Sequence, residues 1–112
     1  MKLSIALITD NSEKWIGKVI KRLQNYIDYT EDVQFIFIDN RSTDDTVPQI
    51  VALINTDFTN EERFKFYINT SKKTIEECEA MVGKIASSEN CVIIKKNTNK
   101  RKLEKAIKEA IK

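Results

Sequence analysis

Three aspartates lie within a short polar segment of the sequence, in the stretch FIFIDNRSTDDT at residues 35–46. A run of apolar β-formers ends at Asp39, a polar loop follows, and an amphipathic pattern begins after Asp45. A carboxylate at a strand end can accept hydrogen bonds from a base N–H or a ribose hydroxyl, so Asp39 is a candidate ligand-binding residue. Asp44 and Asp45 directly precede the expected helix, where carboxylates satisfy free N–H groups and complement the helix dipole. The residue types therefore favour helix capping for these two and leave the role of Asp39 open.

Other familiar kinds of site are excluded by composition. The chain contains no histidine, which removes Ser-His-Asp and Cys-His catalysis in their usual forms. Its two cysteines, Cys78 and Cys91, are far apart and too few for a zinc site, so we predict that both are buried free thiols. The two glycines, Gly17 and Gly83, fall inside predicted helices and cannot build a glycine-rich phosphate loop. Ordinary dinucleotide and P-loop nucleotide binding are therefore not expected.

Charge is distributed unevenly along the chain. The last twenty residues contain eight Lys or Arg and two Glu, a net charge of +6, whereas the whole chain has a net charge of +2 and the remainder therefore −4. A basic terminal helix can attract nucleic acid or anionic lipid, but a solvated helix face is the more common explanation and the one we favour. Nucleic acid is an unlikely partner because no aromatic side chains are interleaved with these cations.

Membrane-spanning and targeting segments are not predicted. The longest apolar runs have the length of strands. The N-terminal apolar run is followed at once by polar and acidic residues, without a small-residue cleavage site. We therefore expect a cytoplasmic protein that begins with its first strand.

The elements that must position the aspartates follow from hydrophobic periodicity. Strands are predicted at residues 2–8, 33–39, 64–68 and 91–94. Helices are predicted at residues 12–27, through 47–54, at 74–86, and through the apolar positions from 103 to 111. Asn11 or Ser12 is the expected N-cap of the first helix. Pro48 fits the first turn of the second helix, where its missing N–H is not needed.

This βαβαβαβα order predicts an α/β fold. The expected architecture is a three-layer α/β/α sandwich, Rossmann-like, with a four-stranded parallel sheet in one domain at residues 1–112. Such sheets bind ligands at the carboxyl ends of their strands, where the strand order reverses. The loops expected to form a site are at residues 9–12, 39–45, 69–73 and 95–99.

Two of these loops resemble a known family. The segments LSIALITDNSEKWIGKVIKRLQNY and VQFIFIDNRSTDDTVPQI are similar to the nucleotide-binding half of family 2 glycosyltransferases, which have the GT-A fold. That family has a Thr-x-Asn turn after its first strand, matched by Thr9 and Asn11, although its usual proline is Ile8 here. A second strand ends in Asp-Asp-Gly-Ser-Thr-Asp-x-Thr. The matching residues are Asp39, Ser42, Thr43, Asp44 and Thr46.

The resemblance implies a sugar-nucleotide site, usually for a UDP-sugar. By resemblance, Thr9 and Asp39 line the base and ribose. Asn11 completes the first turn, and Asn40 and Arg41 replace the second aspartate and the glycine of the family pattern. We count all five as candidate nucleotide-binding residues. No catalytic residue is assigned.

The departures from the family are informative. After its fourth strand the family places an Asp-x-Asp motif that holds Mg²⁺ or Mn²⁺, whereas this chain has VIIKKNTNK without a carboxylate. Hard divalent cations need carboxylate oxygens, so we expect no metal site and no cofactor. Lys95 or Lys96 could instead contact a diphosphate directly. The third helix carries Glu76, Glu77 and Glu79 where the family has an arginine.

Three functional hypotheses follow. The family continues well beyond the metal motif to supply an acceptor site and a base, and a complete transferase is not expected in 112 residues. The first hypothesis is a glycosyltransferase-like domain that binds a nucleotide or sugar nucleotide without transferase activity of its own. The second is a scaffold or protein-interaction module with a decayed site. The third is one part of a split glycosyltransferase completed by another chain.

Overall fold

The computed structural model describes residues 3–27, 33–57, 64–88, 90–95, 101, 104–105 and 108. Its strands are β1 (Leu3–Thr9), β2 (Val33–Asp39), β3 (Phe64–Ile68) and β4 (Cys91–Ile94). Its helices are α1 (Ile16–Ile27), α2 (Thr46–Asp57) and α3 (Ile75–Ile85). All strand pairs are parallel and the strand order is β3-β2-β1-β4.

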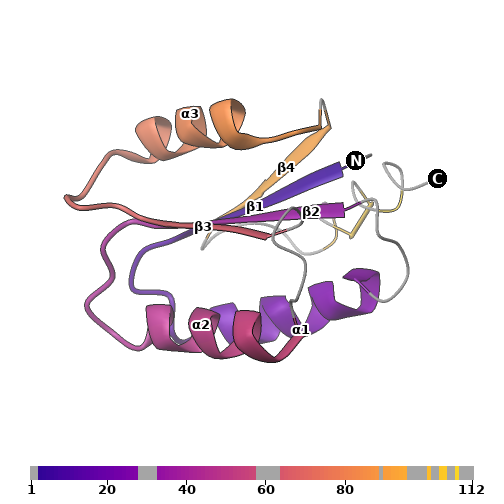
Figure 1. Ribbon diagram of the computed structural model, residues 1–112, viewed down its shortest axis with the longest axis horizontal. Coiled ribbons are helices and arrows are strands. Elements are labelled where there is room, and N and C mark those ends of the chain that lie inside the picture. Colours follow the sequence, from indigo (N-terminus) through magenta and orange to yellow (C-terminus); the bar gives the residue numbers. More distant parts are fainter. Residues whose placement is uncertain are drawn as a thin grey trace.

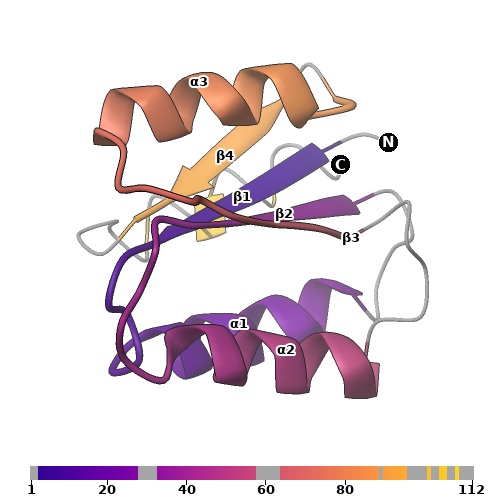
Figure 2. The ribbon, with the colours of Figure 1, turned by 60° about the vertical axis from the view of Figure 1, so that its left-hand side comes forward.

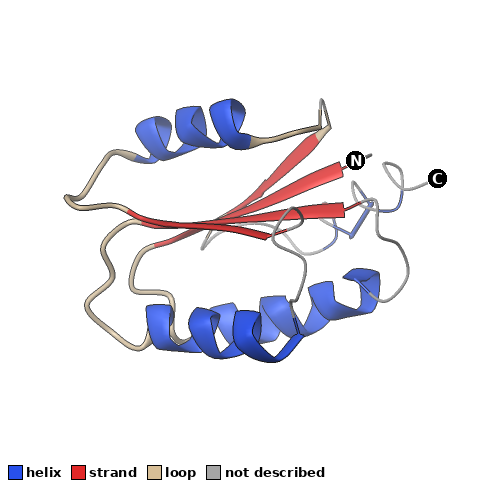
Figure 3. Cartoon of the chain, viewed as in Figure 1, coloured by secondary structure: helices blue, strands red, loops and turns tan. Residues whose placement is uncertain are grey.

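The molecule has three layers. Figures 1 and 2 show α1 and α2 side by side on one face of the sheet and α3 on the other. The same division into helix, sheet and helix layers is visible in Figure 3. The predicted three-layer α/β/α sandwich with a four-stranded parallel sheet is therefore confirmed.

Two hydrophobic cores fill the spaces between the layers. Residues of β1 alternate between them: Leu3, Ile5 and Leu7 belong to the core under α1 and α2. Ala6 and Ile8 belong to the core under α3. This alternation follows from the two-residue period of a strand and requires apolar residues at nearly every position of a central strand.

The central and edge strands differ in burial. All seven residues of β1 and all seven of β2 are buried, as their continuous apolar runs predict. The edge strand β3 is only partly covered, and Tyr67 and Ile68 at its carboxyl end are 40% and 53% exposed. The apolar pattern alone does not distinguish these two situations.

Several predicted boundaries need adjustment. β1 extends to Thr9 rather than stopping at residue 8. α1 begins at Ile16, because a turn precedes it in which the Ser12 carbonyl accepts hydrogen bonds from the N–H groups of Trp15 and Ile16. α3 is as predicted, with a capping box between Thr74 and Glu77 at its start.

The cysteine prediction is half correct. Cys78 is buried in the core under α3, but Cys91 is exposed. Cys91 begins β4 at the edge of the described sheet, where it pairs with Ser4 of β1. Burial raises the pKa of the Cys78 thiol, and partial desolvation by the neighbouring chain raises that of the Cys91 thiol.

Part of the basic C-terminal region lies outside the residues that the structure describes. Lys96 and the apolar positions 103, 106, 107, 110 and 111 of the predicted closing helix are outside the described residues, whereas residues 101, 104–105 and 108 are helical. Across the described part of the chain, no helix has both the length and the apolar character needed to cross a membrane.

Candidate functional site

The strand register brings the predicted site residues to one edge of the sheet. Thr9 pairs with Asp39, and Asp39 pairs with Ile68, so the carboxyl ends of β1, β2 and β3 are level. The Asn40 N–H donates to the Thr9 carbonyl at 2.7 Å, which extends the ladder by one residue. The strand order reverses at β1, because β2 and β3 lie on one side of it and β4 on the other. The loop after β1 therefore borders the switch point between β1 and β4, where such sheets bind ligands, and the loop after β2 lies one strand away from it.

Asp39 is the centre of a buried hydrogen-bond network. One carboxylate oxygen accepts the Thr9 hydroxyl at 2.8 Å and the Ser42 hydroxyl at 2.6 Å. The other accepts the Ser42 N–H at 2.8 Å. Both Asp39 and Thr9 have an exposed fraction of 0%. In this arrangement the two side chains hold the first two loops together and present no surface of their own.

Asn11 ties the same two loops together nearer to the solvent. Its N–H donates to the Ser42 hydroxyl at 2.9 Å, and its side-chain oxygen accepts the Thr43 N–H at 2.8 Å. Its φ is 48°, in the left-handed region that asparagine tolerates better than most residues. Asn11 therefore positions the loop after β1 and does not cap α1, contrary to one of the two predicted N-caps.

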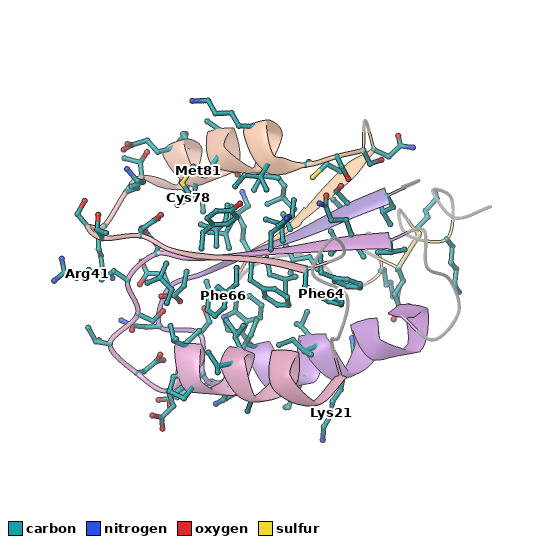
Figure 4. All side chains as sticks on the ribbon, viewed as in Figure 1. Lys21, Arg41, Phe64, Phe66, Cys78 and Met81 are labelled. Atoms are coloured by element: carbon teal, nitrogen blue, oxygen red, sulfur yellow. The ribbon has the colours of Figure 1, made fainter. Side chains whose placement is uncertain are left out.

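Arg41 has a left-handed backbone as well, with φ of 57°. A side chain there costs about 1–2 kcal/mol relative to glycine, which explains why the family pattern has glycine at this position. The Arg41 guanidinium donates to the Thr70 carbonyl at 2.9 Å. The residue is exposed, and Figure 4 shows its side chain projecting outward at the loop end of the molecule. It is therefore a cation at the strand ends with surface available to a ligand.

Asn40 joins the loop after β2 to the loop after β3. Its amide nitrogen donates to the Lys73 carbonyl at 2.9 Å, and its amide oxygen accepts the Lys73 N–H at 2.8 Å. The same oxygen accepts the Asn69 amide at 3.0 Å. A carboxylate could accept from Lys73 but could not donate to its carbonyl. The paired contact with Lys73 therefore needs an amide, which accounts for asparagine in place of the family aspartate.

A surface ion pair adds a third link between the loops. Lys72 and Asp10 are 2.6 Å apart, with side chains 52% and 42% exposed. Exposed pairs of this kind contribute little to stability. The pair nevertheless places a lysine beside the loop after β1, from a position 62 residues away in the sequence.

Asp44 caps two helical segments at once. Its carboxylate accepts the Thr46 N–H at 3.0 Å at the start of α2 and the Glu13 N–H at 3.2 Å in the turn before α1. Burial by itself raises the pKa of Asp44, but the hydrogen bonds from Thr46 and Glu13 outweigh it and the pKa is lowered from its ordinary value of 3.8. The capping prediction is confirmed for Asp44. Asp45 contributes through its backbone, since its carbonyl accepts the Gln49 N–H at 3.2 Å.

The two lysines predicted to contact a diphosphate are only partly described. Lys95 follows β4 and forms an ion pair with Glu79 of α3 at 2.7 Å. Lys96 lies outside the described residues. Among the residues that are described, no group of three or more histidine, cysteine or acidic side chains could hold a metal ion.

Some residues of the network were not predicted as site residues. Ser42 and Thr46 match the family pattern, and their hydroxyls contact Asp39 and Asp44. Asn69 and Lys73 belong to the loop after β3, which the parallel fold indicates as part of the same edge. The fold thus pointed to the correct loop, but the partners within it depend on side-chain geometry.

One comparison with known proteins identifies a family. The sequence profile described as "Glycosyl transferase family 2" matches residues 4–76. Curated protein sequences give no match.

Among solved structures, the chain is similar to S. aureus TarS (residues 1–349). The structure without a named ligand has a TM-score of 0.66 and 22% identity, over 96% of this chain and 32% of that one. The complex with UDP has a TM-score of 0.63 and 21% identity, over 96% and 31%. The complex with UDP-GlcNAc has a TM-score of 0.59 and 25% identity, over 96% and 30%. The chain thus spans about a third of the length of these structures and shares their fold.

Proposed function

Because the chain belongs to glycosyl transferase family 2, we propose that the loops after β1 and β2 bind the nucleotide of a sugar nucleotide. The observation that carries the proposal is the Thr9–Asp39 hydrogen bond at 2.8 Å, which holds the two turns of the family pattern together at the same edge of the sheet. The position of the first turn beside the reversal of strand order between β1 and β4 also supports it.

UDP is the nucleotide that we propose. The support is a similarity of fold to TarS structures, of which one contains UDP and another UDP-GlcNAc. We assign no transferase activity to this chain alone, because it spans about a third of the length of those structures. Sugar transfer would then require further polypeptide, whether from the same protein or from a partner. The cytoplasmic location expected from the sequence is part of this proposal.

The five candidate nucleotide-binding residues have two different roles in this proposal. Thr9, Asp39 and Asn40 are buried and hydrogen-bonded to neighbouring loops, so they shape the site from behind. Arg41 and Asn11 are exposed and can reach a ligand directly. The Arg41 guanidinium is suited to a phosphate, since its planar group can donate two parallel hydrogen bonds.

Lys95 and Lys96 remain the proposed contacts for the diphosphate. To contact a diphosphate, the Lys95 ammonium would have to leave Glu79, which lies 2.7 Å away, or contact Glu79 and the ligand at the same time. Because the pair is partly exposed, the exchange is inexpensive. A lysine supplies charge without the fixed geometry of a bound metal, so the proposal predicts nucleotide binding that does not depend on Mn²⁺.

The test is an NMR titration of ¹⁵N-labelled protein with UDP, with and without Mn²⁺. We expect amide shifts in the loops after β1 and β2, and no stronger binding with Mn²⁺. Arg41→Gln should weaken binding by roughly threefold to tenfold, because it removes one charge-assisted hydrogen bond. Arg22→Gln is the matched control, since Arg22 is an exposed arginine of α1. An equal effect of the two variants would contradict the role of Arg41.

A scaffold function is the second candidate, and one observation favours it. The side chains of Thr9, Asp39 and Asn40 already have internal partners. A site of this kind can be retained for the stability of the loops alone. Absence of any amide shift at millimolar UDP would reject nucleotide binding and favour the scaffold.

A further inference from the structure

A stripe of cations runs along the outer face of α1 and the turn before it. It consists of four exposed residues, at sequence steps of four, three and one: Lys14, Lys18, Lys21 and Arg22. Within α1, the spacing of Lys18, Lys21 and Arg22 places them within about a quarter to a third of the helix circumference, opposite the buried Ile16 and Ile20. Lys14 lies in the preceding turn. Figure 4 shows Lys21 pointing away from the sheet. We call these four residues the basic stripe.

The basic stripe is not neutralised within the described part of the chain. The ion pairs found there are Lys72–Asp10 and Lys95–Glu79, and neither involves the stripe. The sequence of α1, IGKVIKRLQNYI, contains no acidic residue. Among the described residues, no ion pair therefore compensates the positive charge of this helix.

The first two turns of the neighbouring helix α2 expose apolar side chains. α1 and α2 pack against each other on the same side of the sheet (Figures 1 and 2). From Thr46 to Thr56, α2 contains no charged residue. Pro48, Val51 and Ala52 are exposed, and Val51 is 40% exposed. An apolar ridge thus lies beside the basic stripe.

The helix on the opposite face of the sheet is acidic, although lysines lie close to two of its glutamates. α3 carries Glu76, Glu77 and Glu79 against Lys84. Glu76 and Glu77 are exposed at its start. The difference in charge between α1 and α3 favours an orientation with the basic stripe toward an anionic surface.

We propose that the outer face of α1 and α2 docks on an anionic lipid surface. The cations of the basic stripe would lie among the lipid phosphates, and the ridge of Pro48, Val51 and Ala52 would enter the boundary with the acyl chains. Lipid is favoured over nucleic acid because an apolar ridge gains nothing from contact with phosphates and sugars, whereas the membrane interface accommodates both kinds of side chain. The two helices run along one face of the sheet, which suits an extended surface. Docking would leave the loop end of the sheet, with Arg41, free for a ligand.

Cosedimentation of the 112-residue chain with lipid vesicles tests the proposal. We expect binding to phosphatidylcholine vesicles that contain about 30% phosphatidylserine, little binding to phosphatidylcholine alone, and weaker binding as salt is raised. Each cation near such a surface strengthens binding by roughly fivefold, so Lys18→Glu/Lys21→Glu should weaken it by about 25-fold or more. Val51→Asp should weaken binding as well, because it places a charge in the apolar ridge.

Three controls separate this surface from others. Ala80→Asp adds the same charge as Val51→Asp on the exposed side of α3 and should leave binding unchanged. Lys84→Glu reverses a cation on that same helix and should also have no effect. Lys105→Glu/Lys108→Glu reverses two exposed cations of the C-terminal region.

Several outcomes would overturn the proposal. The first is that the protein does not bind the phosphatidylserine vesicles. The second is that Lys105→Glu/Lys108→Glu loses binding whereas Lys18→Glu/Lys21→Glu retains it. The third is that Ala80→Asp and Val51→Asp lose binding to the same extent. Tighter binding to single-stranded or duplex DNA than to the vesicles, abolished by the same stripe variant, would assign the surface to nucleic acid instead. Circular dichroism of each variant confirms that it is folded.

Discussion

At the scale of single residues, Asp39 shows how a predicted ligand contact can be a structural centre. Its carboxylate accepts three hydrogen bonds, from the hydroxyls of Thr9 and Ser42 and from the Ser42 N–H. The sequence places a carboxylate at the strand end but does not state which donors surround it. Those donors come from a strand 30 residues earlier and from the next turn.

Asp39→Asn should destabilise the protein. The amide would turn an NH₂ group toward donors that now face a carboxylate oxygen, and a buried donor left without a partner costs about 1–3 kcal/mol. Urea unfolding measures the difference. Asp45→Asn, an exposed change in the same loop, should alter stability by no more than about 0.5 kcal/mol. Equal stability of the two variants would contradict the structural role of Asp39.

Two substitutions of Arg41 test its left-handed backbone conformation separately from its side-chain hydrogen bond. Arg41→Gly and Arg41→Ala both remove the bond to the Thr70 carbonyl. Because φ is 57° there, the glycine variant should be more stable than the alanine variant by about 1 kcal/mol.

At Arg22, the same pair of substitutions should give a stability difference between glycine and alanine of the opposite sign. Arg22 lies within α1, where glycine is less stable than alanine by about 1 kcal/mol. Urea unfolding of the four variants provides the comparison. If alanine were the more stable residue at both positions, the left-handed conformation of Arg41 would be wrong.

At the scale of elements, the two helices on one face share a cap. Asp44 accepts N–H groups at the start of α2 and in the turn before α1. Thr46 strengthens this link, because its hydroxyl accepts the Ser12 N–H at 2.7 Å. Capping rules applied to one helix predict Asp44 as a local cap, whereas its second role appears only when the two loops are side by side.

Asp44→Ala should reduce stability in a pH-dependent way. At neutral pH we expect a loss of about 1 kcal/mol, as for other N-cap deletions. The folded-state pKa of Asp44 lies below its ordinary value of 3.8, so its contribution is present above pH 3.8 and is lost as the pH falls through the folded pKa. The difference between wild type and variant, from urea unfolding at several pH values, should therefore shrink in acid. A difference independent of pH would show that the charge has no part in the cap.

At the scale of the whole molecule, the sheet connects two cores that do not touch each other. Trp15 packs against the core under α1 and α2, whereas Val82 is 1% exposed in the core under α3. β1 and β2 contribute side chains to both cores. We therefore expect the domain to unfold as one cooperative unit.

Val82→Ala tests this cooperativity. It should lower the free energy of unfolding by roughly 1–3 kcal/mol through the cavity it leaves. Trp15 is the single tryptophan, so its fluorescence reports on the opposite face of the sheet. The urea midpoint of this signal should fall, and Lys84→Ala, an exposed change on α3, should leave it unchanged. An unaltered Trp15 midpoint in Val82→Ala would show that the α3 layer unfolds separately.

The sequence by itself determined the fold class and the edge of the sheet at which the candidate site residues lie. Apolar runs predicted β1 and β2 as buried strands, amphipathic periods predicted the three helices, and their alternation predicted a parallel sheet with helices on both faces. These features depend on the periodicity of apolar residues within one segment, which can be read without knowing the rest of the fold. The family turns at Thr9 and Asp39 are local in the same sense.

Only the tertiary structure decided how those turns are used. Burial of Asp39, the paired contact of Asn40 with Lys73, and the shared cap at Asp44 each depend on groups that are distant in sequence. Exposure of Cys91 likewise depends on its place at the start of an edge strand. A hydrogen bond needs its donor and acceptor within about 3 Å, and residue types and spacing cannot specify such distances between separate segments.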